Sequence, residues 1–157
     1  MKKILTLTSL LAGMFLTGAN ALADHHEAKA NSDVEYLSAS SDVENTLPFS
    51  DAVRVGDVLY VSGKIGNRPG TLELAEGGIQ GETRQTLENI KASVERYGFS
   101  MARPIKCTVF LADIAEWAQM NEIYVQFFPG NKPARSAFGA SGIALAGRVE
   151  IECMFAR

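Results

Sequence analysis

Two stretches of helical periodicity, set among strand-like runs, constrain the fold of this chain more than any other feature. In residues 82–97, apolar side chains recur at spacings of three and four, which is typical of a helix with one buried stripe. A second such stripe, which includes Trp117 and Tyr124, follows Asp113, a residue that can cap a helix N-terminus. Each helix is therefore expected to pack one side against a sheet.

The strands are predicted from alternating apolar and polar residues. The runs AVRV and VLYV flank Gly56 and Asp57, a pattern that predicts a β-hairpin. Two helices cannot cover both faces of a five-stranded sheet, so we expect an α+β fold of order β-β-α-β-α-β-β. Both helices should lie on one face of a mixed sheet, with the other face against water or a second subunit. The three later strands are predicted at 105–111, 135–139 and 148–155.

The N-terminal part of the chain has the composition of a targeting segment. Two lysines, a short apolar run and the sequence ALA at residues 21–23 are typical of a secretory signal peptide spanning residues 1–23. The alternative is a membrane anchor, but the apolar run is short for a bilayer span and no cysteine follows that could carry a lipid. Residues 24–46 are expected to be a flexible leader, because they are rich in Ala, Ser, Asp and Glu. The protein is therefore expected to be periplasmic or secreted, with no membrane attachment after cleavage at Ala23.

The charge balance argues against nucleic acid as a partner. The formal net charge is −3, and it falls to −5 without the two lysines of the predicted signal peptide. Nucleic-acid binding needs clustered Lys and Arg, and the chain has no basic stripe. The histidines, His25 and His26, both lie in the predicted leader, where an exposed tail is favoured over a metal site. No nucleotide-binding glycine motif is present, so neither a cofactor nor a metal is expected.

The two cysteines, Cys107 and Cys153, both lie in apolar, strand-like runs. A disulfide can form in an exported protein, because compartments outside the cytoplasm are oxidising. We nevertheless favour two buried free thiols, since free cysteine commonly packs as a small apolar side chain. Nothing in the sequence sets the distance between the two residues.

One arginine and a pair of glutamates near the C-terminus are the side chains that could carry chemistry. In the strand predicted at 148–155, Glu150 and Glu152 share the face that points away from the helices. Arg135 could reach them or share a cleft with them. From the residues alone, an Arg–Glu pair at a sheet or subunit surface is favoured. The alternative is a site where the guanidinium binds a substrate carboxylate and a glutamate holds a water or moves a proton.

Several segments, taken together, resemble the RidA (YjgF) family of reactive imine deaminases. The similarity covers about Thr46 to Arg157 in the family's order, and predicts a RidA-like domain at residues 47–157. It implies a chorismate-mutase-like fold and a homotrimer with ligand clefts between subunits. It also implies hydrolysis of 2-aminoacrylate and related imines to 2-keto acids and ammonia, without metal or cofactor. The expected partner is thus a small carboxylate-bearing metabolite. The segments are VGDVLYVSGKIG, ETRQTLENIKASVERYG, KCTVFLADIAEWAQMNEIYVQFFPGNKPARSAFG and VEIE.

The resemblance also implies roles for single residues. Arg135 matches the arginine that binds the substrate carboxylate, and Glu150 matches the glutamate that places the attacking water. Two positions depart from the family pattern. Phe49 stands where a tyrosine is usual, so the ring is kept and its hydroxyl is lost, and Ala137 stands where Cys, Thr or Ser is common. The other positions that match the pocket are Ser62, Gly63 and Asn121.

Three other functions stay open at this point. Phe49 and the predicted export favour a carboxylate-binding protein without turnover. A chaperone-like holdase of the same fold would not depend on Arg135. A chorismate mutase shares the fold type but has no sequence support here. The predicted export also leaves the source of an imine open, because such imines arise at pyridoxal-phosphate enzymes in the cytoplasm.

Overall fold

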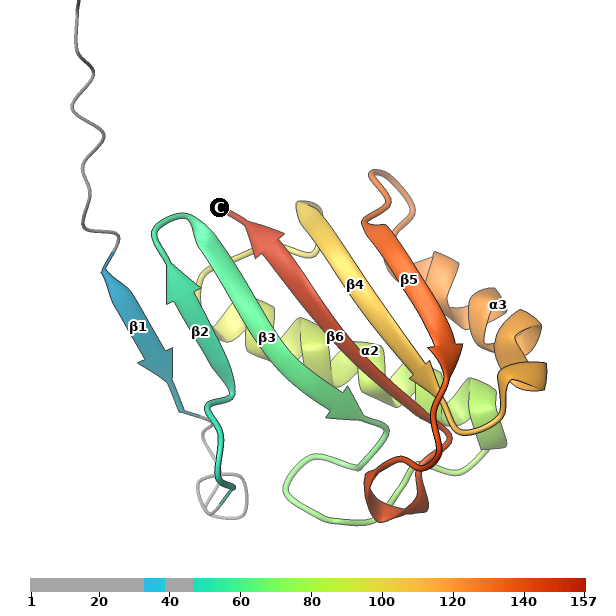
Figure 1. Cartoon of the computed structure of the whole chain (residues 1–157). Helices are drawn as coiled ribbons and strands as arrows, with labels where there is room; N and C mark the ends of the chain where they lie inside the picture. Colours follow the sequence, from blue (N-terminus) through green and yellow to red (C-terminus); the bar gives the residue numbers. More distant parts are fainter. Residues whose placement is uncertain (1–32, 39–46) are drawn as a thin grey trace, which may run out of the picture. The chain divides into compact units, whose positions relative to one another are not determined.

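The fold is a mixed six-stranded sheet with two helices behind it (Figure 1). The computed structural model describes residues 33–38 and 47–157, so the predicted signal peptide and most of the predicted leader lie outside the described residues. The strand order is β1-β2-β3-β6-β4-β5, and all neighbours are antiparallel except β4 and β5. The strands are β1 (Val34–Leu37), β2 (Ala52–Val55), β3 (Val58–Ile65), β4 (Pro104–Leu111), β5 (Ala134–Gly139) and β6 (Val149–Ala156).

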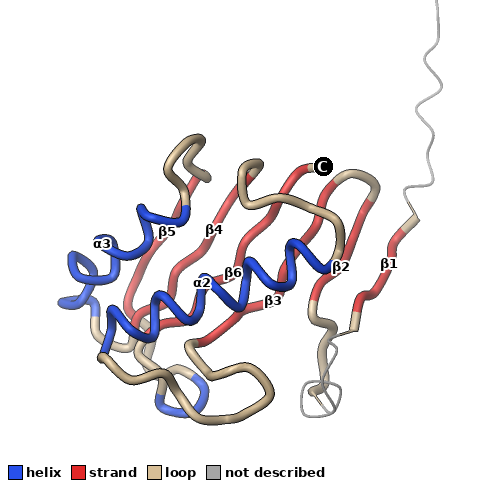
Figure 2. Tube along the Cα trace, turned by 180° about the vertical axis from the view of Figure 1, so that it is seen from behind, coloured by secondary structure: helices blue, strands red, loops and turns tan. Residues whose placement is uncertain are grey.

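Both long helices lie on the same face of the sheet, as predicted (Figure 2). Helix α2 (Gly78–Arg96) begins four residues before the predicted start and ends beside Gly98, whose φ of 75° suits a glycine. Helix α3 (Trp117–Phe127) follows a short 3₁₀ turn that Asp113 caps, as predicted from the sequence. No helix within the described ranges has the length and apolar character needed to cross a membrane.

The core fills the space between the sheet and the helices. On β6 the burial alternates strictly, as predicted, so Glu150 and Glu152 lie on the open face opposite the helices. The face of the sheet that the helices leave uncovered carries the carboxylates and also several exposed apolar side chains. The core-facing residues of β6 are Val149, Ile151, Cys153 and Phe155.

Strand β1 was not expected, because it lies inside the predicted flexible leader. Its four residues pair antiparallel with β2, and they belong to the compact unit Asn31–Arg157. Arg54 forms an ion pair with Glu35 across the two strands, and the backbone N–H of Asp51 donates to the carbonyl of Leu37 at 2.9 Å. The strand is mostly exposed, so it carries no buried stripe that sequence periodicity could reveal. It forms because β2 would otherwise leave its backbone groups unpaired at the sheet edge.

The prediction of two free thiols was wrong, because Cys107 and Cys153 form a disulfide. The two residues are direct partners on the antiparallel strands β4 and β6, and their Cα atoms are 4.1 Å apart. Antiparallel pairing brings residues that are 46 positions apart in the sequence to this short distance. The pairing depends on strand order, which the spacing of the cysteines does not contain.

Candidate functional site

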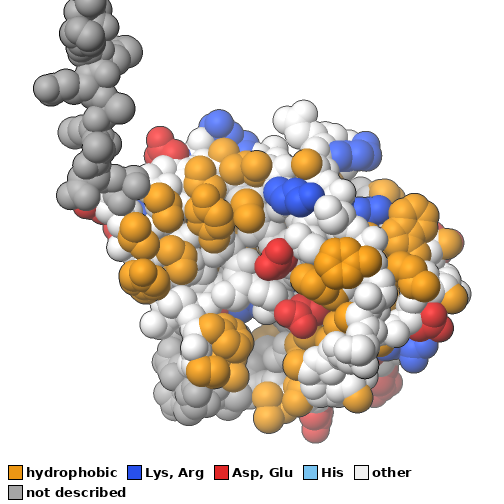
Figure 3. Space-filling model, in the orientation of Figure 1, with side chains coloured by type: hydrophobic (Ala, Val, Ile, Leu, Met, Phe, Trp, Pro, Cys, Tyr) orange, Lys and Arg blue, Asp and Glu red, His pale blue; other side chains and the backbone are white. Residues whose placement is uncertain are grey.

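A cavity of about 320 Å³ opens beside the end of β3. Its walls come from residues 47–51, 63–72 and 144–150, which are far apart in the sequence. Figure 3 shows the open face of the sheet, where acidic side chains lie among hydrophobic ones and the surface is hollowed toward the lower edge. The volume falls at the lower end of the range for small-molecule sites. Three of the predicted site residues line this cavity: Phe49, Gly63 and Glu150. We call these three residues the cavity half-site.

Glu150 lies against the backbone of β3 at Gly63. A Cβ atom added to Gly63 would stand 3.0 Å from Cδ of Glu150 and closer still to its Oε1, so a side chain at this position would displace the carboxylate. The register between β3 and β6 shifts between Val61 and Lys64, and Gly63 lies within that irregularity. Burial raises the pKa of Glu150, and the nearby charge of Glu152 raises it further. Glu150 is therefore a stronger base than an ordinary glutamate.

Ser62 is next to the cavity but does not line it. Its hydroxyl donates to the carbonyl of Ser50 at 2.7 Å, which ties the segment that carries Phe49 to β3. Ser62 therefore supports the cavity wall through this hydrogen bond.

Arg135 lies on β5, which forms the edge of the sheet opposite β1. Its Nη1 donates to Oδ1 of Asn121 on α3 at 2.7 Å. Its guanidinium carbon lies 4.7 Å from the ring centre of Tyr124 and 5.6 Å from that of Trp117. Within residues 33–38 and 47–157, no carboxylate forms an ion pair with Arg135. The cation is held by an amide and by aromatic faces, which leaves its charge available to an anion.

The aromatic residues beside Arg135 were interpreted from the sequence only as the apolar stripe of a helix. Tyr124 is buried, and its hydroxyl has no hydrogen-bond partner in the described part of the chain. Burial raises the pKa of Tyr124 to about 12, although the charge of Arg135 acts in the opposite direction. The hydroxyl therefore stays protonated and is a donor without an acceptor. The helical spacing gave no signal for this role, because it is the same for a core tyrosine.

The predicted approach of Arg135 to Glu150 does not occur within one chain. Arg135 is the strand partner of Cys107 on β4, and its side chain points to the helix side. Glu150 is the strand partner of Phe110 on β4, and its side chain points to the open face. Ala137 shares the helix side of β5 and packs, half-buried, against the core. One chain therefore carries two separate groups of predicted residues. We call Asn121, Arg135 and Ala137 the arginine half-site.

Asp51 forms a buried polar cluster in the cavity wall that sequence reasoning missed. Its carboxylate forms an ion pair with Lys64 and accepts from the Tyr97 hydroxyl at 2.7 Å and from Arg96 at 3.4 Å. Burial alone would raise the pKa of Asp51, but the contacts with Lys64 and Tyr97 outweigh it, so the pKa is lowered. The cluster ties the segment before β2 to β3 and to the end of α2. No spacing rule links these positions.

Glu82 on α2 makes a buried contact behind the cavity wall. Because α2 begins at Gly78, Glu82 lies in the second turn and is buried, and its Oε2 accepts from the backbone N–H of Arg148 at 2.7 Å. This contact holds the turn before β6, in which Leu145 and Ala146 have φ values of 57° and 58°. Glu82 thus fixes the end of the cavity wall that leads to Glu150.

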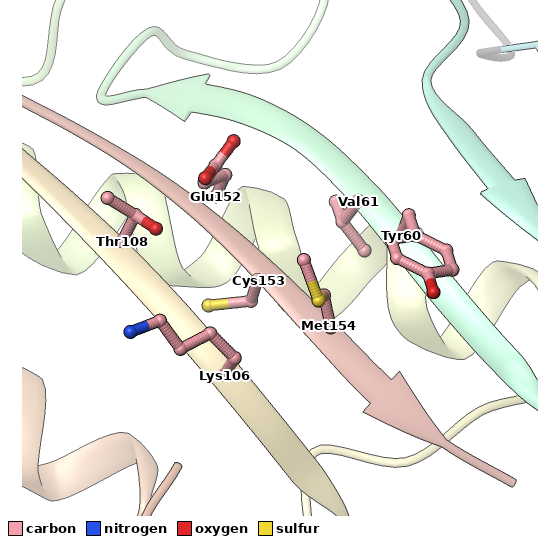
Figure 4. A pocket seen from close by; sticks show the side chains of 7 residues that line it. All are labelled: Tyr60, Val61, Lys106, Thr108, Glu152, Cys153 and Met154. Carbon is pink, nitrogen blue, oxygen red and sulfur yellow. The ribbon is translucent and has the colours of Figure 1, made fainter. Parts of the chain in front are cut away.

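A second, smaller hollow lies on the open face over β4 and β6 (Figure 4). Its volume is about 70 Å³, which holds only a few waters. Lys106 lines it, but its amino group donates to the hydroxyl of Ser136 at 2.8 Å. Among the described residues, no three His, Cys, Asp or Glu side chains gather in a way that could hold a metal. The larger cavity is therefore the candidate site.

Together, the fold and the two half-sites define a small α+β protein with a carboxylate in a cavity and, on an edge strand, an arginine that has no ion-pair partner among the described residues. The chain belongs to the RidA (YjgF) family, as its sequence predicted: the family described as Endoribonuclease L-PSP matches residues 39–156.

Similar proteins of known sequence and structure agree with this assignment. A RutC family protein of Pyrococcus horikoshii is 42% identical over 107 residues, which are 68% of this chain and 85% of that protein. The human 2-iminobutanoate/2-iminopropanoate deaminase is 38% identical over 107 residues, 68% of this chain and 78% of that protein. The crystal structure of YyfA, of the conserved Rid protein family, from Yersinia pestis has 32% identity and a TM-score of 0.74, covering 80% of this chain and all of that chain. The predicted α+β fold is thus confirmed.

Proposed function

We propose that this protein is a hydrolytic deaminase that converts small 2-imino and 2-enamino acids to 2-keto acids and ammonia. The observation that carries this proposal is Glu150, a half-buried carboxylate in the cavity wall whose pKa is raised by burial. The human relative that is named a 2-iminobutanoate/2-iminopropanoate deaminase supports the reaction class.

We further propose that the working site lies between two copies of the chain in a homotrimer. The support is geometric: the arginine half-site and the cavity half-site point to opposite faces of the sheet, so one chain cannot apply both to one small molecule. The open face also carries exposed apolar side chains that a second copy would cover, as Figure 3 illustrates. These side chains include Tyr60 and Phe138.

In the proposed reaction, Arg135 holds the substrate carboxylate with two parallel hydrogen bonds, and Asn121 fixes the orientation of the guanidinium. Glu150 accepts a proton from a water molecule as the water oxygen attacks the imine carbon, which gives a carbinolamine. The same proton passes from Glu150 to the imine nitrogen as the carbinolamine forms. Glu150 then accepts the proton of the carbinolamine hydroxyl and transfers it to the nitrogen, so the carbon–nitrogen bond breaks and ammonia leaves as the keto group forms. The raised pKa of Glu150 suits both proton transfers.

Phe49 favours one second candidate, a protein that binds small carboxylates without turnover. The ring lines the cavity, but it has no hydroxyl that could hold a water or a substrate nitrogen. Saturable binding of a 2-keto acid with no release of ammonia would select this candidate.

Ribonuclease activity, which the family description names, is not part of our proposal. The chain is acidic overall, and both of its histidines precede residue 27, so the domain itself has no histidine for acid–base cleavage of RNA. We propose no nucleic acid partner for the same reason.

We also propose that the mature protein begins at Asp24 and acts in the periplasm or outside the cell. The signal-like residues 1–23 support export, and the disulfide between Cys107 and Cys153 suits an oxidising compartment. Sequencing of the N-terminus after export would test the cleavage site, and a mature chain that retains residue 1 would contradict it.

The deaminase proposal is tested with the mature chain, residues 24–157. An amino-acid oxidase generates the imine in place, and formation of the 2-keto acid is followed with the wild type, Arg135→Ala and Glu150→Gln. Acceleration by the wild type that both variants lose is the expected result. If all three proteins leave the rate of spontaneous hydrolysis unchanged, the deaminase proposal fails.

A further inference from the structure

The mouth of the larger cavity is surrounded by large apolar side chains that are exposed in the chain. Leu47, Phe49, Leu72 and Leu145 line the cavity with 43%, 55%, 63% and 45% of their surface exposed. We call these four residues the apolar rim. Scattered exposed leucines are ordinary, but four large apolar side chains from three separate segments around one opening are not.

Leu145 has an unfavourable backbone conformation in this position. Its φ of 57° is left-handed, and the following Ala146 has a φ of 58°, so two consecutive residues with Cβ atoms adopt a conformation that glycine or asparagine would adopt at less cost. The bond from the Arg148 N–H to the buried Glu82 carboxylate holds this turn in place. Strain of this kind persists where the surrounding structure imposes it, and it often marks a functional site.

The side chains of this cavity that are less exposed than the rim include charged ones. Glu150 and Lys64 line its walls together with Gly63, and Lys64 is paired with the buried Asp51. A molecule in the cavity would therefore meet a reactive carboxylate inside and apolar carbon at the opening. Its polar, reacting end belongs beside Glu150, and an apolar end belongs at the rim.

We propose that the preferred substrates are 2-imino acids with a large apolar side chain, of branched-chain or aromatic type, and that Leu72 and Leu145 determine this preference. The inference rests on the proposed deaminase function. A three-carbon imino acid held beside Glu150 leaves most of a cavity of about 320 Å³ unfilled, and the rim would then contact only water. A side chain of four to seven carbons reaches the rim and removes its apolar surface from water.

The experiment compares imines of different size in one assay. An oxidase produces the imines of alanine, leucine and phenylalanine in place, and kcat/KM is measured for each with the mature chain. Two rim variants are used: Leu72→Ser, and Leu145→Asn, because asparagine tolerates the left-handed backbone. Val34→Thr is the matched control, since Val34 is 49% exposed on β1 and does not line the cavity.

The wild type is expected to favour the leucine and phenylalanine imines over the alanine imine by roughly 10-fold or more in kcat/KM. Each rim variant should reduce this ratio by roughly 5- to 20-fold, and Val34→Thr should leave it unchanged. A wild-type ratio near one, or a ratio that the rim variants do not change, overturns the inference while the deaminase function stands. Rim variants that disrupt the oligomer without changing the ratio also overturn it, because the rim would then be a subunit contact.

If no imine is hydrolysed faster than in buffer, the deaminase proposal fails and the same proteins are used in calorimetry. Binding of pyruvate is then compared with binding of 4-methyl-2-oxopentanoate. Tighter binding of the larger acid that is lost in Leu72→Ser and Leu145→Asn supports the apolar rim as a specificity site. Equal binding of the two acids, or none, overturns it.

Discussion

The carboxylate of Glu150 on β6 packs against Gly63 on β3, where a Cβ atom would stand 3.0 Å from its Cδ. Gly63→Ala should therefore displace Glu150 and lower kcat by about 100-fold, as misplacement of a reacting group by about 1 Å does. Gly130→Ala is the matched control, because a Cβ atom there meets nothing within 4 Å. The two variants are compared by imine hydrolysis and by thermal unfolding. Full activity of Gly63→Ala would show that the position of Glu150 is not critical.

The planar guanidinium of Arg135 should be needed as well as its charge. Arg135→Lys keeps a cation but loses the paired donors and the bond to Asn121, so KM is expected to rise roughly 10- to 100-fold, more than kcat falls. The exposed Arg103→Lys serves as the control and should change neither constant. A KM for Arg135→Lys equal to that of the wild type would argue against a carboxylate clamp.

The pH dependence of hydrolysis should report the repulsion between two carboxylates. The pKa of Glu150 is raised by burial and by Glu152, and the base form is the ionised one, so kcat/KM should fall as the pH drops through this raised pKa. Glu152→Gln removes the second charge and should move the acid limb of the profile to lower pH. A raised carboxyl pKa favours the protonated folded state, so the wild type should lose stability as the pH rises through the pKa of Glu150. In Glu152→Gln this loss of stability should be smaller.

An acid limb that stays in place in Glu152→Gln would contradict this prediction, because the limb would then not depend on the charge of Glu152. Glu122→Gln is a suitable charge control, since Glu122 lies on the exposed side of α3 and contacts Gln80. It removes the same charge from the protein without approaching the cavity.

The disulfide should contribute strongly to stability. Cys107 and Cys153 close a segment of chain with a sequence separation of 46, for which the loss of unfolded-state entropy corresponds to roughly 3–4 kcal/mol. Guanidinium unfolding with and without a phosphine reductant measures this difference. The double variant with alanine at both positions is the control and should not respond to the reductant. A wild-type midpoint that is unchanged after complete reduction would contradict the prediction.

Periodicity predicted the hairpin, both helices and the alternating faces of β6, because each is a pattern within a few neighbouring residues. It did not predict β1, whose side chains are exposed and whose partner is a backbone edge. It also could not predict the bond between Cys107 and Cys153, since that depends on which strands become neighbours.

The candidate site shows the same limit. Alternation along β6 placed Glu150 on the open face correctly, but β4 lies between β5 and β6, and β5 directs Arg135 to the helix side. No local pattern contains that strand order. Asp51 and Glu82 were missed as supports of the cavity because their partners, Lys64 and the backbone of Arg148, are set by tertiary packing.

The walls of the larger cavity come from segments that begin at Leu47 and end at Glu150, a span of about a hundred residues. The cavity thus exists only after β6, the last strand in the chain, has inserted between β3 and β4. A ligand that occupies it can bind only the completed fold, so binding raises the free energy of unfolding of the whole domain as the ligand concentration increases. A small acid added during refolding would therefore shift the folding equilibrium toward the native chain. Protection against denaturation would then report occupancy of the cavity without any measurement of turnover.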